Sequence, residues 1–245
     1  MSRAHTTGAA PAFRGGLGIL VQKLGGTFSA VLGIDLPSRE PGQIFRWLLA
    51  SLLFGARISE RIAANTYREF ERAGVVSPET ILSTGWQGLV DILDRGAYVR
   101  YDFKTATKLL EVSRALLDRY GGDLNALHGE AEDTPDLERR IKDLGKGVGE
   151  VTANIFLREM RGVWAKAEPL PGDLVCAAAR DLGLVGADAT DSRGILESLR
   201  SRWLQEGMPA ARFSDLEAAL VRHGKALRAT GRHRAAGAGA KHGVR

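Results

Sequence analysis

Hydrophobic residues recur along much of the chain at spacings of three and four, the pattern of helices that bury one face. Gln43 to Leu53 is apolar on most sides and predicts a central, buried helix. Ile58 to Ala73 is amphipathic, with Ser59 placed as its N-cap. No run alternates in the manner of a β-strand, so the pattern predicts an all-α protein. Further helices are expected at Ser77–Leu82, Trp86–Arg95, Asp102–Tyr120, Asp173–Gly183, Arg193–Trp203 and Pro209–Gly224.

Two short helical patterns flank a glycine-rich segment, Gly145-Lys146-Gly147-Val148-Gly149. The apolar residues with helical spacing are Leu137, Ile141 and Leu144 before the segment, and Val151, Ile155 and Phe156 after it. The glycines permit positive φ angles and leave backbone N–H groups bare. These groups precede a helix N-terminus, where the helix dipole favours an anion, and Lys146 adds a positive charge. The segment predicts contact with one phosphate of a nucleic acid; the alternative is an ordinary helix–glycine turn–helix.

This stretch resembles the helix-hairpin-helix motif of the endonuclease III superfamily of DNA base-excision glycosylases. The shared pattern is an apolar residue, the Gly-Val-Gly turn, Thr152-Ala153 and a final Leu157. The resemblance runs from about Pro41 to Lys225 and includes the order of the helices. It implies an all-α fold of two helical lobes, with a DNA cleft between the lobes.

The resemblance also implies the boundaries of the lobes. A six-helix lobe with the motif would cover residues 41–164, and the second lobe would combine residues 15–40 with 165–230. Small and polar residues at 1–14 predict a disordered N-terminus. Residues 231–245 are basic, contain no acid and predict a flexible, solvated tail. Such a tail can add nonspecific affinity for DNA, but the sequence does not say whether this one does.

Two positions bear on the chemistry that the resemblance implies. Asp173 follows the motif and begins a helix, at the point in the order where the superfamily has its essential acidic group. A carboxylate facing the deoxyribose stabilises the positive charge of glycosidic cleavage and orients the attacking water. The alternative for Asp173 is a helix N-cap. Val151 stands where bifunctional members have a lysine nucleophile, and valine cannot attack the sugar.

The resemblance places the expected DNA contacts at Gly145, Lys146, Gly147, Val148, Gly149, Thr152, Arg57, Tyr98, Arg100, Lys104, His223 and Lys225. Arg57 falls closest to the residue that fills the gap left by a flipped nucleotide. Tyr98 and Arg100 lie in the segment that enters the duplex from the other side, and Lys104 is a helix-start lysine near a phosphate. His223 and Lys225 resemble the His-Gly-Arg segment of the family's last helix. The alternatives without a role in DNA binding are a surface charge for Arg57, aromatic packing near Tyr98, and a C-terminal helix cap for His223.

Composition and charge limit the partners, cofactors and cellular compartments to be expected. The chain has 245 residues, 44% of them hydrophobic, a net charge of +5 and a pI of about 9.5, which suits a polyanionic partner. The single cysteine, Cys176, makes no intrachain disulfide and no four-cysteine cluster, so we expect no iron–sulfur cluster and no other cofactor. Residues 1–14 lack a signal-peptide core, and no apolar run is long enough to span a bilayer. We expect a soluble, cytoplasmic, nucleoid-associated monomer.

These features predict a monofunctional DNA N-glycosylase of base-excision repair that removes a damaged or mispaired base from double-stranded DNA. The stretch from Pro41 to Ser59 contains no acid, which disfavours adenine as the base, because adenine glycosylases of the superfamily use a glutamate there. One alternative is a catalytically silent protein that binds bent or damaged duplex. A weaker one is a bifunctional glycosylase and abasic-site lyase with a relocated lysine such as Lys146. The sequence does not name the base, since base choice depends on pocket shape.

Overall fold

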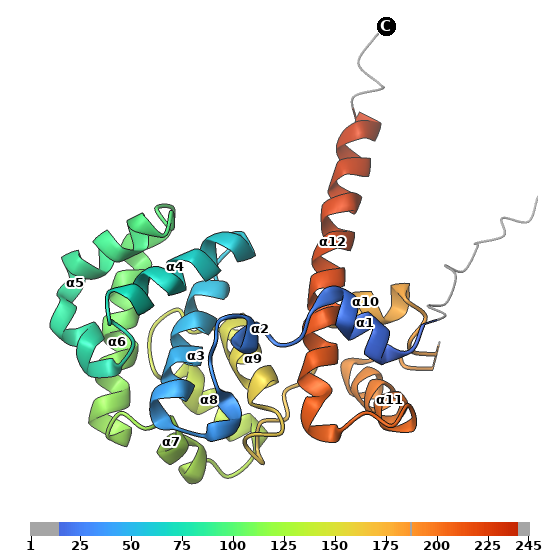
Figure 1. The fold of residues 1–245 in the computed structure, drawn as a ribbon, viewed down its shortest axis with the longest axis horizontal. Coiled ribbons are helices and arrows are strands. Elements are labelled where there is room, and N and C mark those ends of the chain that lie inside the picture. The colour runs from blue at the N-terminus through green and yellow to red at the C-terminus, as the bar shows by residue number, and fades with distance from the viewer. Residues whose placement is uncertain (1–14, 187, 240–245) are drawn as a thin grey trace, which may run out of the picture. The chain divides into compact units, whose positions relative to one another are not determined.

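The computed structural model of the chain describes residues 15–186 and 188–239, with side chains as far as Thr230. Throughout this described part the secondary structure is helical and no β-strand forms, which confirms the predicted all-α class (Figure 1). Within the same residues, no helix combines the length and the apolar character that crossing a bilayer requires.

The chain divides into two compact units. The central unit is residues 27–169, and the terminal unit combines residues 1–26 with 170–245. The central unit contains α2 (Phe28–Val31), η1 (Leu36–Ser38), α3 (Pro41–Phe54), α4 (Glu60–Arg72), α5 (Pro78–Arg95), α6 (Asp102–Tyr120), α7 (Leu124–Glu130), α8 (Thr134–Lys142) and α9 (Glu150–Met160). The terminal unit contains α1 (Leu17–Leu24), α10 (Asp173–Asp181), α11 (Ser192–Gln205), η2 (Ala210–Arg212) and α12 (Phe213–Gly239).

Helix α3 forms the middle of the central unit, as its all-round apolar sequence predicts. It packs against α4, α6, α7 and α9, and most of its residues from Ile44 to Leu53 are buried. The indole of Trp47 donates a hydrogen bond to the Phe156 carbonyl of α9, at 3.1 Å. The next helix, α4, is capped by Ser59 as predicted, since its hydroxyl accepts from the Ile62 N–H at 3.2 Å. These contacts fix the position of α9, the helix that follows the glycine-rich segment.

Residues 27–40 belong to the central unit, in contrast to the expected assignment to the second lobe. The N–H groups of Phe28 and Ser29 donate to the two carboxylate oxygens of Glu159, each at 2.8 Å. Glu159 is buried near the end of α9, and burial raises the pKa of its carboxyl group. Thr27 caps α2 through the Ala30 N–H, and the Glu159 carboxylate takes the two N–H groups before it and ties the segment to α9.

Residues 165–169 also belong to the central unit rather than to the second lobe. The buried guanidinium of Arg161 pairs with Glu168 and donates to the Pro169 carbonyl at 2.6 Å. The Lys166 ammonium donates to the carbonyl of His128 at 2.9 Å, at the end of α7. The loop after α9 is therefore folded back onto the central unit by buried or half-buried charges.

In the terminal unit α10 and α12 cross very closely at Gly224. A Cβ atom at this position would lie 2.3 Å from the Leu174 carbonyl oxygen, so only glycine fits. Arg222 of α12 donates to the carbonyls of Gly25 and Gly26, at 3.0 and 2.6 Å, and so fixes the segment that follows α1.

Two helices differ in extent from the prediction. The helices expected at Ser77–Leu82 and Trp86–Arg95 form one element, α5, with a kink at Gly85, where φ is 70°. The last helix does not end at Gly224 but continues to Gly239, so the expected flexible tail is helical over residues 231–239. Residues 1–14 and 240–245, for which disorder and flexibility were predicted, lie outside the described residues.

Candidate nucleic-acid interface

The glycine hairpin, residues 145–149, connects α8 to α9 and packs against α6. A Cβ atom at Gly145 would lie 2.9 Å from the Val112 side chain, so this residue is glycine because the helix approaches closely. Gly147 has a φ of 86°, which favours glycine for a conformational reason. The hairpin is thereby held at a fixed place on α6.

The backbone N–H groups of the hairpin are not all bare, which corrects the prediction. The Lys146 N–H donates to Glu111 Oε2 at 3.0 Å, and the buried Val148 donates to the Gly145 carbonyl at 3.1 Å. The first paired N–H of α9 belongs to Ala153, which donates to Gly149 at 3.0 Å. No acceptor in the described part of the chain takes the N–H groups of residues 150–152. The anion-binding groups are thus in the first turn of α9.

Three lysines surround this turn. Lys146 is exposed at the tip of the hairpin. Lys142 pairs with Glu150 at 2.5 Å, and this hydrogen bond raises the pKa of the Lys142 ammonium. Lys108 of α6 lies over Gly147: its Cε atom is 3.2 Å from the place of a Cβ atom there. Lys108 is not among the predicted DNA contacts, and nothing in the spacing of the motif indicates it.

The C-terminal end of α3 brings together segments that are far apart in the sequence. The Tyr98 hydroxyl donates to the Leu53 carbonyl at 2.8 Å. A Cβ atom at Gly55 would lie 2.3 Å from the Thr152 Oγ1 atom, in the first turn of α9. The loop with Arg57, the segment from Tyr98 to Arg100 and the start of α9 therefore flank one end of one helix.

Three of the predicted DNA contacts are buried, which corrects their assignment. Tyr98 is completely buried, and burial raises the pKa of its phenol. Thr152 packs against Gly55, and Val148 lies under the hairpin. These three side chains hold the loops in place and do not face a ligand. Two aromatic rings that do face solvent are Trp86 and Phe103, with centroids 5.2 Å apart, and neither was among the predicted DNA contacts.

Three charged residues predicted to contact DNA are exposed. The Arg57, Arg100 and Lys104 side chains face solvent, and no described residue forms an ion pair with them. The Arg100 guanidinium lies over the Tyr101 ring, 5.5 Å from its centroid. With Lys146, these residues leave uncompensated positive charge near the start of α9.

Asp173 lies in the terminal unit, as the first residue of α10. The N-cap is Gly172, and no side-chain cap is formed, so the N-cap alternative for Asp173 is wrong. Its side chain is 94% exposed, and the nearest cation is the Arg228 guanidinium of α12, at 3.6 Å. The carboxylate is thus available to a ligand, with one arginine beside it.

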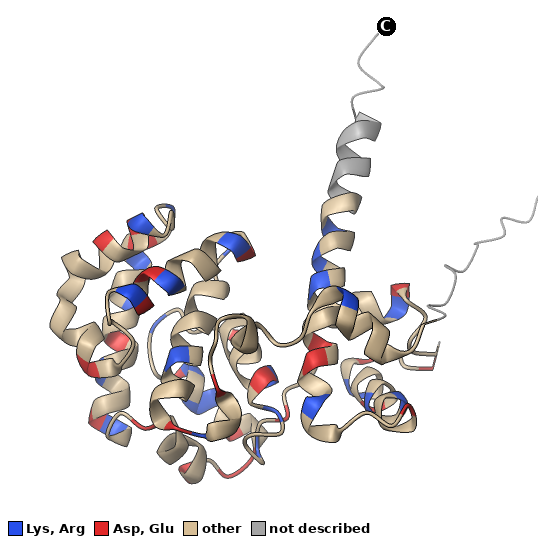
Figure 2. Ribbon diagram, viewed as in Figure 1, with Lys and Arg blue, Asp and Glu red and all other residues tan. Residues whose placement is uncertain are grey.

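His223 and Lys225 lie within α12, on either side of the closely packed Gly224. The His223 Nε2 atom is 2.7 Å from the Asp181 carboxylate at the end of α10. Because α12 continues to Gly239, the alternative of a C-terminal helix cap for His223 is wrong. Lys225 is exposed, and Figure 2 shows blue positions along this part of α12.

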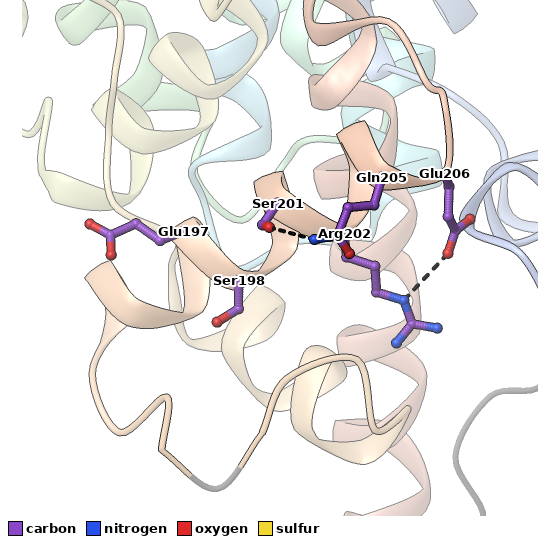
Figure 3. Close-up of a pocket in the computed structure, with 6 residues that line it drawn as sticks. All are labelled: Glu197, Ser198, Ser201, Arg202, Gln205 and Glu206. Atoms are coloured by element: carbon purple, nitrogen blue, oxygen red, sulfur yellow. Dashed lines mark hydrogen bonds and ion pairs between the residues drawn. The ribbon is translucent and has the colours of Figure 1, made fainter.

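A shallow depression in the terminal unit contains none of the predicted residues. It has a volume of about 620 Å³ and is lined by one helix, α11 (Figure 3). Its polar side chains bond along that helix, Gln205 to Ser201 at 3.2 Å and Arg202 to Glu206 at 3.3 Å. A surface made by one helix does not enclose a nucleobase, so we assign it no role.

No cluster of three or more potential metal ligands occurs among the described residues. Cys176 is buried in α10, and its Sγ atom lies 3.5 Å from the Pro171 carbonyl. The expected absence of an iron–sulfur cluster stays a prediction based on the single cysteine. In comparisons with known proteins, the chain matches no protein-family model and no curated protein.

Proposed function

We propose that this protein is a monofunctional DNA N-glycosylase that hydrolyses a damaged or mispaired base from duplex DNA. The observation that supports it best is the first turn of α9, where three successive N–H groups have no acceptor in the described chain. Exposed cations surround this turn, among them Arg57 and Lys146. Backbone donors at a helix start, with cations around them, are what binding a phosphate requires.

The chemistry belongs to Asp173 in this proposal. Water attacks C1′ of the deoxyribose, the bond from C1′ to the base nitrogen breaks, and the base leaves with that electron pair. Positive charge develops on the sugar, and an exposed carboxylate stabilises it and orients the water. The glycine hairpin belongs to the central unit and Asp173 to the terminal unit, so the reaction needs both units on one duplex.

The resemblance to the endonuclease III superfamily supports the assignment to this reaction class. The order of the hairpin, the following aspartate and His223-Gly224-Lys225 agrees with that superfamily. Val151 occupies the place of the lysine nucleophile, and its side chain is exposed. Without an amine there, direct attack on the sugar is absent, which favours hydrolysis over strand cleavage.

A catalytically silent DNA-binding protein is the second candidate. The ion pair between Asp173 and Arg228, at 3.6 Å, favours it, because the arginine competes with the sugar for the carboxylate. A protein of this kind would bind duplex DNA through the surface around α9 and would release no base.

A panel of duplexes separates the two candidates. The duplexes carry uracil, a thymine–guanine mispair, an alkylpurine or an oxidised purine, and base release is measured separately from strand nicking. The glycosylase predicts base release by the unmodified protein from at least one duplex. Asp173→Asn should abolish release without weakening duplex binding, because it removes a negative charge and little volume.

The matched control is Glu197→Gln, which neutralises an exposed carboxylate of the same unit on α11. Release at the unmodified rate is expected from this variant. Binding without release from any duplex would favour the silent protein, and full release by Asp173→Asn would remove the aspartate from the mechanism.

A further inference from the structure

Lys108 has an unusual environment for a lysine. It lies on α6, and its aliphatic arm crosses Gly147 of the glycine hairpin: Cε and Nζ are 3.2 and 3.7 Å from the place of a Cβ atom at that glycine. The side chain is half-buried. Lysine usually keeps its ammonium in water and buries only its stem. Here the ammonium lies beside the hairpin.

The Lys108 ammonium has no partner within the described residues, either by hydrogen bond or by ion pair. Burial without compensation lowers the pKa of this ammonium. The nearest acid along the helix, Glu111, instead accepts from the Lys146 N–H at 3.0 Å. A half-buried cation that lacks an anion lies over the hairpin that leads into the unpaired N–H groups of α9, and this arrangement suits an anion from outside the protein.

Lys104 extends the same row by one helical turn. The two lysines are separated by about 6 Å along the axis of α6 and share a face. Like charges at this spacing destabilise a helix by themselves. No described residue neutralises Lys104, which is exposed. Successive phosphates of one DNA strand supply negative charge at a comparable spacing.

We propose that Lys108 is a phosphate-binding residue, which binds the same DNA phosphate as the first turn of α9, while Lys104 binds the next phosphate along that strand. The ammonium of Lys108 approaches from α6 and the N–H groups from α9. The inference rests on the duplex binding in the proposed function and is independent of base release.

The test is a salt titration of binding to an undamaged duplex, with variants of the full chain. Lys108→Met keeps the aliphatic arm against Gly147 and removes the charge. It should reduce the slope of log affinity against log salt by about 0.9, the value for one phosphate. At 0.1 M salt its affinity should fall about tenfold, the loss of one charged hydrogen bond. Lys108→Arg should retain the slope of the unmodified protein.

Arg114→Gln is the matched control. Arg114 is exposed on the same helix, about 120° round the axis from Lys108, and the variant removes one positive charge away from the hairpin. Its slope should equal that of the unmodified protein. Thermal unfolding of each variant verifies that the fold is retained.

Two results would overturn the inference: Lys108→Met with an unchanged slope, or Arg114→Gln with the same loss as Lys108→Met. Base release is measured in parallel with the damaged duplexes. Reduced slope in Lys108→Met without base release by the unmodified protein supports Lys108 and overturns the glycosylase. Base release together with an unchanged slope in Lys108→Met supports the glycosylase and overturns the role of Lys108. Absence of any salt-dependent duplex binding overturns both the glycosylase and the role of Lys108.

Discussion

Val151 and Thr152 are neighbours in the chain with opposite environments. Val151 is 63% exposed in the first turn of α9, whereas Thr152 is buried with its hydroxyl against Gly55. This reverses the usual preference of apolar and polar side chains. The close approach of α3 to α9 explains this reversal, because the smaller side chain of the turn, Thr152, must face Gly55. Position 151, where the resemblance implies the nucleophile of bifunctional enzymes, therefore opens to solvent.

This exposure predicts that Val151→Lys leaves the fold intact. A lysine there stays in water, and its better helix propensity offsets the unfavourable interaction of its charge with the start of α9, so stability should change by less than about 1 kcal/mol. Thr152→Lys is the contrasting variant, since it forces an ammonium into a buried contact and should cost several kcal/mol. Thermal unfolding of both variants measures the difference. Equal losses of stability would contradict the orientation of the first turn.

Among single residues, the sequence predicted which charged side chains are exposed better than it predicted which aromatic side chains are buried. Arg57, Arg100, Lys104 and Lys146 are exposed as predicted. Tyr98 is not, because its phenol bonds to Leu53 and its ring fills the core. An aromatic residue next to basic residues fits either a stacking surface or a core, and one sequence does not distinguish them.

At the scale of elements, the glycines of the hairpin serve different needs. Gly145 avoids Val112 of α6, and Gly147 adopts a φ of 86°. Gly149 has an ordinary φ of −103° and open space around it. It is the N-cap of α9, so a side chain at Gly149 is compatible with the fold and reaches only the three unpaired N–H groups.

Gly149→Asp separates DNA binding from stability. Aspartate is a favourable N-cap, so the free energy of unfolding should rise by about 0.3 kcal/mol relative to glycine. Its carboxylate would accept from the N–H groups of α9 and repel a phosphate, so duplex affinity should fall by about tenfold or more. Gly149→Ser is the control, a neutral N-cap with a much smaller loss of affinity. Affinity is measured in a salt titration, and stability by denaturant unfolding. Unchanged affinity in Gly149→Asp would show that this turn does not bind the phosphate.

The spacing of apolar residues predicted the bounds of a helix well where that spacing is regular along the whole helix. The range Asp102–Tyr120 was predicted as it is found. It failed at two glycines inside helices. Gly85 has a positive φ and open space around it and kinks α5 without ending it, whereas Gly224 lets α12 cross α10 in mid-helix. A glycine in a helical pattern can mark a helix end, a kink or a close approach, and the pattern of one sequence does not distinguish them.

At the scale of the whole molecule, the missing information is which helix packs on which. Glu111 of α6 accepts a hydrogen bond from the glycine hairpin, and Glu159 of α9 accepts from Phe28 and Ser29. Each contact joins segments far apart in the chain. An apolar stripe shows that a helix has a partner but does not identify it, so these polar contacts were not predictable from the sequence.

Glu159 predicts a pH dependence of stability. Its pKa is raised from 4.5 by burial, so the folded protein holds a proton that the unfolded chain has released. Stability therefore falls as pH rises from 4.5 to the raised pKa, and is constant above it. Glu159→Gln should remove this dependence. It should also cost about 1–3 kcal/mol, because its amide accepts only one of the two N–H groups. Denaturant unfolding over this range measures both. The same pH dependence in the variant would contradict the assignment.

The reaction products test the molecule as a whole. If Val151 leaves the site without an amine nucleophile, the protein should release a free base and leave an abasic strand that breaks only on later treatment with alkali. Borohydride should then trap no covalent adduct between protein and DNA, since no Schiff base forms. Val151→Lys, which places an amine in the exposed first turn of α9, is the positive comparison and should give trapping. Efficient trapping by the unmodified protein would refute the monofunctional assignment. The amines around that turn are those of Lys142, Lys146 and Lys108, and replacing each of them in turn by methionine would then identify the nucleophile by loss of the adduct.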